Sequence, residues 1–218
     1  MTKFLRLSSA VAFLALMLMV FLVHSASAID QRAPEQIVEE TTTVVLAALN
    51  KEHARLKEDP TLINNLINET IIPIVDLNSM GKLILGKHWK RASEEQRSSF
   101  VSEFKDMLVR TYAKSLVDYG HAEVKVLPDR NSKESKYHTV KTELYIGSGK
   151  APLQIAYIFR NNKQDEWKVF DLSVDGLSLV KNFRTSFSQE IKETSLDALI
   201  ERLANTNKTG ATDEMQTE

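Results

Sequence analysis

Apolar residues follow two different periods along this chain, and the change falls near residue 120. Before that point they recur every three or four positions, which predicts helices with one buried face. Beyond it they recur at every second position, which predicts strands. The expected helices span 34–58, 60–73, 77–85 and about 94–119. The expected strands begin at 122 and cover 139–146, 152–160 and 166–174, and two closing helices follow at 177–191 and 196–203.

Local signals mark several of these boundaries. Asp59 is placed to cap the second helix, with Pro60 at its first position. Ser93 followed by Gln96 forms a capping-box pattern before the longest helix, and Gly120 ends that helix. The first helices are therefore predicted with defined ends.

Turn sequences at 147–150 and 161–165 join neighbouring strands, which indicates hairpins. Consecutive hairpins give an antiparallel, curved sheet of about four strands. The alternation in the last strand predicts Trp167, Val169 and Asp171 on one side, with Phe170, Leu172 and Val174 on the other. With its helices gathered against one face of the sheet, the chain is predicted to be an α+β protein.

The N-terminal segment, 1–28, has the pattern of a secretory signal peptide. Lys3 and Arg6 precede an apolar run at 11–23, and Ala26-Ser27-Ala28 is the small-residue pattern for cleavage after Ala28. The run is shorter than the roughly 20 residues that a transmembrane helix needs. We therefore expect an exported protein with a globular domain at 29–204 and a disordered tail at 205–218.

Composition limits the possible functions of the exported part. The 218 residues carry a formal net charge of −1, and losing Lys3 and Arg6 makes the remainder more acidic, so nucleic acid is not an expected partner. There is no cysteine, so the fold must be stable without disulfides. This combination suits a periplasmic protein.

The sequence shows no catalytic or metal-binding pattern. The histidines His53, His88, His121 and His138 show no metal-ligand spacing, and neither a metal nor a cofactor is expected. Asp76 and Asp171 are the best-placed carboxylates, yet a single buried aspartate is more often a helix cap or a hydrogen-bonded core group than a general base. No catalytic residue is predicted.

Ordered motifs along 34–204 resemble the MlaC family of periplasmic phospholipid-binding proteins, also called toluene-tolerance transporter auxiliary components. The matching segments are Ile-Pro-Ile-Val-Asp (72–76), Leu-Gly-Lys-His-Trp (85–89), Ser-Glu-Glu-Gln-Arg (93–97) with Phe100 and Phe104, Trp-Lys-Val-Phe-Asp (167–171), and Val-Asp-Gly-Leu-Ser-Leu-Val (174–180) with Asn182, Phe183, Arg184 and Phe187. Asp175 and Phe183 replace the more frequent Glu and Tyr of the family.

The resemblance implies a cystatin-like or nuclear-transport-factor-like scaffold with an apolar cavity between sheet and helices. A bound phospholipid would place its acyl tails there. The implied function is transport of phospholipid between the two membranes, which maintains outer-membrane asymmetry. The implied partners are an outer-membrane lipoprotein–porin complex and an inner-membrane ABC transporter with a substrate-binding ring.

Site residues are predicted on this basis. The tail pocket is expected to be lined by Phe104, Leu108, Tyr112, Leu144, Ile155, Tyr157 and Val169. A basic cluster is expected to form a headgroup rim or a partner surface: Lys82, Lys87, Lys90 and Arg91. Arg184 is a candidate partner for Asp76 or Asp171. Two alternatives remain open: an enzyme on the same scaffold that uses Asp76 or Asp171, and a ligand-free adaptor between membrane complexes.

Overall fold

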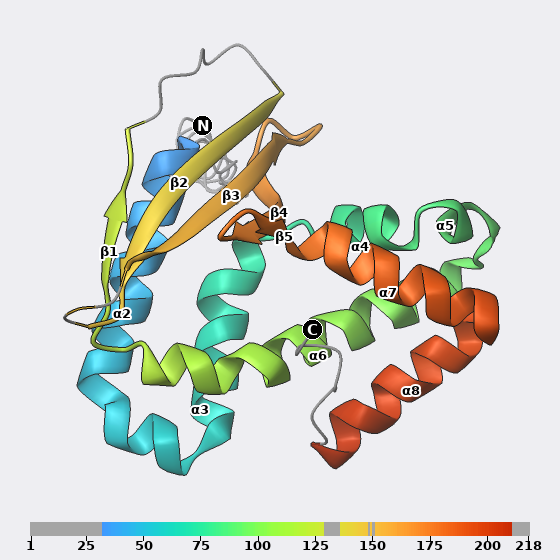
Figure 1. Ribbon diagram of the computed structural model, residues 1–218, viewed down its shortest axis with the longest axis horizontal. Helices are drawn as coiled ribbons and strands as arrows, with labels where there is room; N and C mark the ends of the chain where they lie inside the picture. The colour runs from blue at the N-terminus through green and yellow to red at the C-terminus, as the bar shows by residue number, and fades with distance from the viewer. Residues whose placement is uncertain (1–31, 129–135, 148, 150, 211–218) are drawn as a thin grey trace, which may run out of the picture. The chain divides into compact units, whose positions relative to one another are not determined.

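The computed structural model describes residues 32–128, 136–147, 149 and 151–210, all within one compact unit that spans Gln31–Glu218 (Figure 1). The predicted signal peptide at 1–28 lies outside the described residues. The helical elements are α2 (Pro34–Glu58), α3 (Pro60–Leu66), the π-helical turn η2 (Ile67–Ile71), the 3-10 turn η3 (Ile72–Ile74), α4 (Leu77–Leu85), α5 (Lys87–Arg91), α6 (Glu94–Asp118), α7 (Leu179–Glu193) and α8 (Leu196–Thr209). The strands are β1 (Glu123–Val126), β2 (Tyr137–Tyr145), β3 (Leu153–Asn161), β4 (Trp167–Val174) and β5 (Leu177–Ser178).

The helix ends follow the local signals in the sequence. The Asp59 side chain accepts a hydrogen bond of 2.9 Å from the Thr61 backbone N–H at the start of α3. Ser93 and Gln96 form both bonds of the capping box before α6. Residues 87–91, which carried no predicted element, form the short helix α5.

The five strands follow one another through an antiparallel sheet in the order β1-β2-β3-β4-β5. The α+β class with a curved antiparallel sheet is therefore confirmed, with one strand added at the edge. Asp175 (φ 47°) and Gly176 (φ 84°) form the two-residue turn into β5. Two successive positive φ values are typical of the hairpin turn that Asp-Gly favours.

A β-bulge changes which residues of β4 face inward. Phe159 pairs with Val169, but Ile158 pairs with Asp171, so Phe170 is the extra residue. The strict alternation predicted for β4 is therefore wrong beyond Val169. The bulge places Leu172 on the same face as Val169, while Asp171 turns to the other face.

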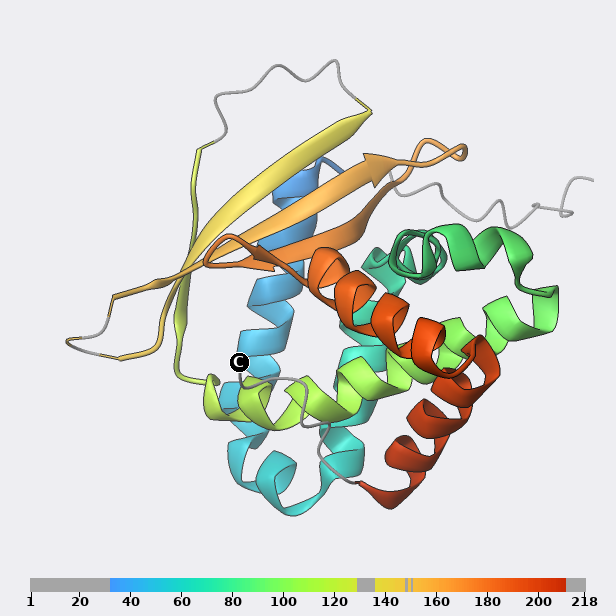
Figure 2. The ribbon, with the colours of Figure 1, turned by 45° about the vertical axis from the view of Figure 1, so that its right-hand side comes forward.

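Figures 1 and 2 show α2 running along one face of the sheet, with α4, α6, α7 and α8 gathered beside it. The packed interior divides into three clusters. The aromatic cluster joins α4, α6, α7 and α8 around Phe100, Phe104, Phe183 and Phe187. The second cluster joins α2, α3 and α6. The third joins the sheet to α2 through Ile37, Val38, Val140, Phe159 and Val169.

The C-terminal helix extends further than the sequence indicates. Helix α8 continues to Thr209, into the segment predicted to be disordered from residue 205. The Asn207 amide donates hydrogen bonds to the backbone carbonyl (3.0 Å) and the carboxylate (2.8 Å) of Glu103 on α6. These contacts to α6 hold the last turn in place without apolar periodicity. Residues 211–218 lie outside the described part.

Candidate functional site

One row of paired residues crosses the inner face of the sheet, which is the face that carries Val140 and Phe159 against α2. Its members are Val126, Thr142, Ile155, Val174 and Leu177, each paired with the next across neighbouring strands. Directly paired residues of antiparallel strands point to the same face. Thr142 is fully buried, whereas Leu177 keeps 76% of its surface exposed. The inner face is therefore covered near β1 and β2 and open toward β5.

Several residues of this face belong to none of the three packed clusters in the described part of the chain. We call them the open inner face: Thr142, Leu144, Leu153, Ile155, Leu172, Val174 and Leu177. All but Thr142 are aliphatic. An aliphatic surface left outside the packed core is the expected wall of an apolar binding cavity.

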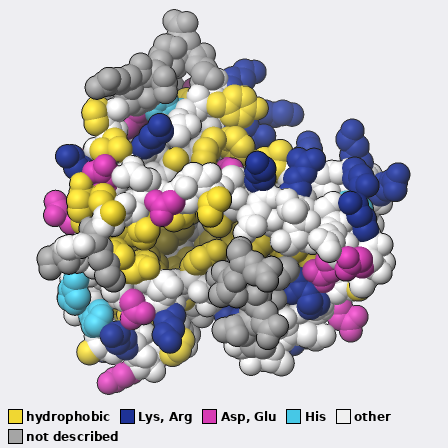
Figure 3. All heavy atoms as spheres, viewed as in Figure 1, with side chains coloured by type: hydrophobic (Ala, Val, Ile, Leu, Met, Phe, Trp, Pro, Cys, Tyr) yellow, Lys and Arg dark blue, Asp and Glu magenta, His cyan; other side chains and the backbone are white. Residues whose placement is uncertain are grey.

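The opposite wall is the C-terminal half of α6. This helix packs mainly on α2, α3, α4 and α8 rather than on the sheet. Leu108 and Tyr112 lie four positions apart, and Tyr112 keeps 38% of its surface exposed while burial of the rest raises the pKa of its hydroxyl. Figure 3 shows hydrophobic side chains gathered in a hollow between the β4–β5 hairpin and α6.

A polar pair interrupts the apolar surface. The Thr142 hydroxyl is buried and makes no hydrogen bond of normal geometry with a described residue. It lies beside Tyr157, whose pKa is raised by burial and lowered to a smaller extent by this neighbour. A buried hydroxyl without a partner is costly, and this pair places a polar group among the aliphatic side chains of the open inner face.

The structure separates the seven predicted pocket residues into two groups. Leu144 and Ile155 on the inner face and Tyr112 on α6 lie outside the packed clusters. Phe104 is fully buried in the aromatic cluster and Leu108 packs against it, while Val169 belongs to the third cluster and Tyr157 packs against it. These four side chains are part of the packed interior. Leu153, Leu172, Val174 and Leu177 were not predicted to line the pocket. Leu153 follows the predicted alternation, whereas the bulge turns Leu172 and Val174 inward and Leu177 lies in β5 rather than in the predicted helix.

The predicted basic residues lie on α4 and α5 and not on the strands of the open inner face. Lys82 is exposed on α4, and Lys87, Lys90 and Arg91 are exposed on α5. Figure 3 shows lysine and arginine side chains crowded over this part of the molecule. Lys82 also lines a polar groove of about 1010 Å³, together with Lys136, Arg160, Lys163 and Lys168.

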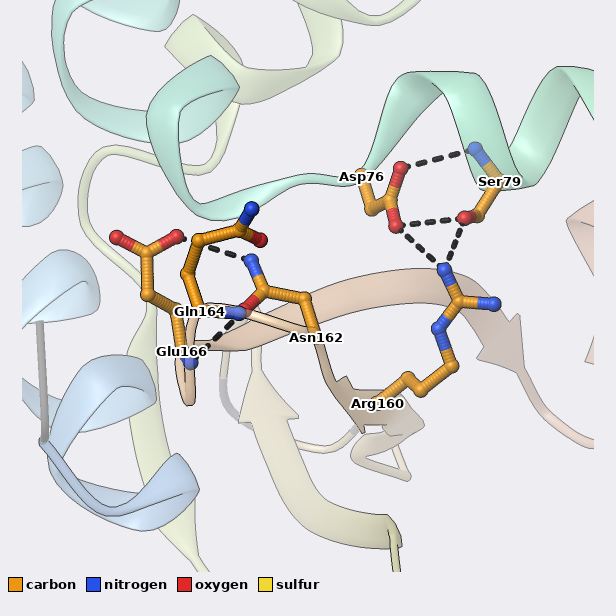
Figure 4. Close-up of polar contacts among 6 residues, drawn as sticks. All are labelled: Asp76, Ser79, Arg160, Asn162, Gln164 and Glu166. Atoms are coloured by element: carbon orange, nitrogen blue, oxygen red, sulfur yellow. Dashed lines mark hydrogen bonds and ion pairs between the residues drawn. The ribbon is translucent and has the colours of Figure 1, made fainter. Parts of the chain in front are cut away.

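The two candidate catalytic aspartates act as helix caps. Asp76 accepts hydrogen bonds from the Ser79 backbone and hydroxyl and pairs with Arg160 at 2.8 Å (Figure 4). Asp171 accepts from Ser178 Oγ at 2.6 Å and from the Val180 backbone at 3.1 Å. Arg184 lies against Gly86. Among the described residues Arg184 pairs with neither Asp76 nor Asp171, so its predicted pairing is wrong: Arg160 pairs with Asp76, and Asp171 accepts from Ser178 and Val180.

The described ranges offer neither a metal site nor a membrane-spanning helix. No three His, Asp or Glu side chains there are arranged to hold a metal ion. No helix among these residues has the length and apolar character to cross a membrane.

These features define an α+β protein with an apolar hollow between a curved antiparallel sheet and its helices. Residues 39–205 match the family model described as MlaC protein, and the chain belongs to the MlaC family. The resemblance noted in the sequence is thereby confirmed.

Similar proteins agree with this assignment. The intermembrane phospholipid transport system binding protein MlaC of Haemophilus influenzae is 23% identical over 191 residues, covering 87% of this chain and 89% of that protein. Toluene tolerance protein ttg2D of Pseudomonas putida is 27% identical over 167 residues, covering 76% of each. A phospholipid-binding protein of Ralstonia solanacearum, solved in complex with a phospholipid, superposes with a TM-score of 0.74 at 23% identity. The superposition covers 84% of this chain and 99% of the Ralstonia chain, which establishes the shared fold.

Proposed function

We propose that this protein is a periplasmic phospholipid carrier that holds acyl tails against the open inner face of its sheet. The observation that carries the proposal is the set of aliphatic side chains on the inner face, including Leu144 and Ile155, that lies outside the packed clusters. Figure 3 shows a hydrophobic hollow between the β4–β5 hairpin and α6. The phospholipid-binding names of the similar proteins support the same ligand class.

The physical demand on such a carrier is high. Two chains of about 16 carbons contain roughly 30 methylenes, each costing about 0.8 kcal/mol to expose to water. A carrier that crosses an aqueous compartment must therefore enclose nearly all of both tails. Transfer from a bilayer into an apolar cavity changes the environment of the tails little, so the carrier need not bind them more tightly than the membrane does.

Docking to membrane complexes completes the proposal. We expect this carrier to exchange lipid with an outer-membrane lipoprotein–porin complex and with an inner-membrane ABC transporter that has a substrate-binding ring. The cations Lys82, Lys87, Lys90 and Arg91 are proposed as a partner surface, because all four are exposed and gather on α4 and α5. The direction of net transport then depends on the energised partner, since a passive carrier cannot bias flux.

An enzymatic role is not proposed. The carboxylates of Asp76 and Asp171 are each occupied by helix-capping hydrogen bonds. A general base needs a lone pair directed at a substrate proton.

The test is extraction of the purified protein with organic solvent, followed by mass spectrometry. We expect a two-chain phospholipid in stoichiometric amount. An extract without lipid, from protein prepared without detergent, contradicts the carrier function and favours a ligand-free adaptor.

A further inference from the structure

The β4–β5 hairpin holds a large apolar side chain in water. Leu177 is the most exposed large hydrophobic residue of the described chain, at 76%. Its partner across the hairpin is Val174, which pairs in turn with Ile155 on β3. Leu177 is therefore the outermost member of an apolar path that leads across the inner face of the sheet.

Hydrogen bonds on both sides fix this position. Before Leu177, the Asp175 N–H donates to the Gln154 carbonyl at 2.8 Å, and the Gln154 N–H donates to Asp175 Oδ1 at 2.9 Å. After it, the Ser178 hydroxyl donates to Asp171 Oδ2 at 2.6 Å and accepts from the Lys181 N–H at 3.0 Å. The exposure of Leu177 is thus held by the backbone around it.

The two ends of the row of paired residues from Val126 to Leu177 differ in how they are packed. At the β1 end, Val126 packs against the third cluster, beside α2. At the β5 end, no described cluster includes Leu177. Figure 3 shows a hollow lined by hydrophobic side chains, and Figure 1 places the β4–β5 hairpin above that region in the same view. The hollow is closed toward β1 and bordered by the hairpin on its open side.

We propose that the β4–β5 hairpin is the portal through which acyl chains enter and leave the hollow, with Leu177 contacting the chain at the mouth. This inference rests on the proposed carrier function. An acyl chain that slides from Ile155 past Val174 to Leu177 keeps apolar contact along the whole path. Fewer methylenes are then exposed to water during passage, which lowers the barrier to exchange.

A single cysteine tests the contact. The chain has no cysteine, so Leu177→Cys introduces the sole thiol. Its alkylation by a maleimide is compared in lipid-loaded protein and in protein depleted with methyl-β-cyclodextrin. We expect alkylation to be slower by about threefold or more when lipid is bound, because the chain covers the thiol. The matched control is Val44→Cys on α2, at 52% exposed, which should react equally in both states.

Equal rates for Leu177→Cys in the two states overturn the portal. Protection that depends on protein concentration and not on lipid also overturns it, since a second copy of the chain would then cover the hairpin. A wild-type extract without phospholipid is a different failure, because it removes the carrier function itself.

A charged variant tests whether acyl chains pass Leu177 as they enter and leave the hollow. Leu177→Asp places a carboxylate at the mouth, and a passing chain must strip water from it. We expect release of bound phospholipid to methyl-β-cyclodextrin to be about tenfold slower, equivalent to about 1.4 kcal/mol in the barrier. Because Leu177 also contacts the bound chain, we expect the bound amount at equilibrium to fall slightly, so the release rate is measured on the lipid that stays bound. Release at or above the wild-type rate contradicts the assignment.

Discussion

Arg160 of β3 and Asp76 at the start of α4 form an ion pair, with 2.8 Å between Arg160 Nη2 and Asp76 Oδ2. Both side chains are partly exposed, at 37% and 20%, so the charge interaction itself contributes little. The same carboxylate caps α4 through Ser79, and Arg160 also donates to the Ser79 hydroxyl. Through this ion pair and these hydrogen bonds, Asp76, Ser79 and Arg160 connect α4 to strand β3 of the sheet.

Substitution of Asp76 separates the cap from the charge. Asp76→Ala removes both and should lower the free energy of unfolding by about 2 kcal/mol. Asp76→Asn keeps a capping oxygen and should lose less than about 1 kcal/mol. Urea unfolding of both variants provides the measurement. Equal losses would mean that the cap does not contribute.

Filling the open inner face should displace ligand. Leu144→Trp and Ile155→Trp each add bulk where the described residues leave a hollow, so the bound phospholipid should fall to about half or less while the protein stays folded. Solvent extraction with mass spectrometry gives the lipid content, and circular dichroism gives the fold. Val44→Trp adds the same bulk at an exposed position of α2 and should leave the lipid content unchanged.

His88 should make stability depend on pH. Burial, followed by the charges of Lys87 and Arg91, lowers the pKa of His88 below its ordinary value of 6.5. The folded protein therefore binds this proton more weakly than the unfolded chain does, and protonation favours unfolding. The resulting loss of stability is absent well above pH 6.5 and develops as the pH falls through that value and the lowered folded pKa.

The measurement is the difference in unfolding free energy between wild type and His88→Gln from pH 7.5 to 5. As the pH falls, the unfolding free energy of wild type should decrease relative to that of His88→Gln. Lys87→Gln removes the second contribution to the lowered pKa and should reduce this trend without abolishing it. A difference independent of pH would contradict the prediction.

Gly81 marks a close approach of α4 to α6. A Cβ at this position would lie 2.9 Å from Val101 Cγ2 and 3.4 Å from the Trp89 ring. Gly81→Ala should therefore destabilise the protein by about 1–2 kcal/mol, since overpacking outweighs the gain in helix propensity. Adding Val101→Ala should recover part of the loss, and a double-mutant cycle measures the recovery. Strict additivity of the two changes would contradict the contact.

The helices were predictable because their signals are local. Asp59, Pro60, Ser93 and Gln96 lie within a turn of the ends that they define, and the structure confirms these ends. Helix α5 was missed because its five residues are too few to show a period. The end of α8 was missed because Asn207 is held by Glu103, a contact that spans 104 positions.

The sheet was predictable in class and less so in detail. The Asp175-Gly176 pair is a strong hairpin signal, yet the strand after it has only two residues, so β5 was not predicted. The bulge at Phe170 leaves no mark in an alternating pattern. The pairing of Arg160 with Asp76 depends on the three-dimensional approach of two segments 84 positions apart.

The residues that line the candidate site are harder to predict from the sequence than the helices and strands. Period and polarity identify inward-facing residues, but they do not distinguish a side chain in solid packing from one beside a hollow. Phe104 and Ile155 both satisfy the pattern, and only the arrangement of α6 relative to the sheet separates them. Assignment of the open inner face to acyl tails stays a prediction until lipid content is measured.

The order of strands has a consequence for how the chain folds. Each strand pairs with its neighbour in the sequence, so every loop that closes during sheet formation is short in comparison with the chain. The entropy lost on loop closure grows with loop length, and local pairings therefore form quickly. The sheet can assemble one hairpin at a time, whereas the contact of α2 with β2 joins residues about 100 positions apart, as between Glu35 and His138. We expect docking of α2 to be the slower step, and it is the step that covers the closed end of the inner face.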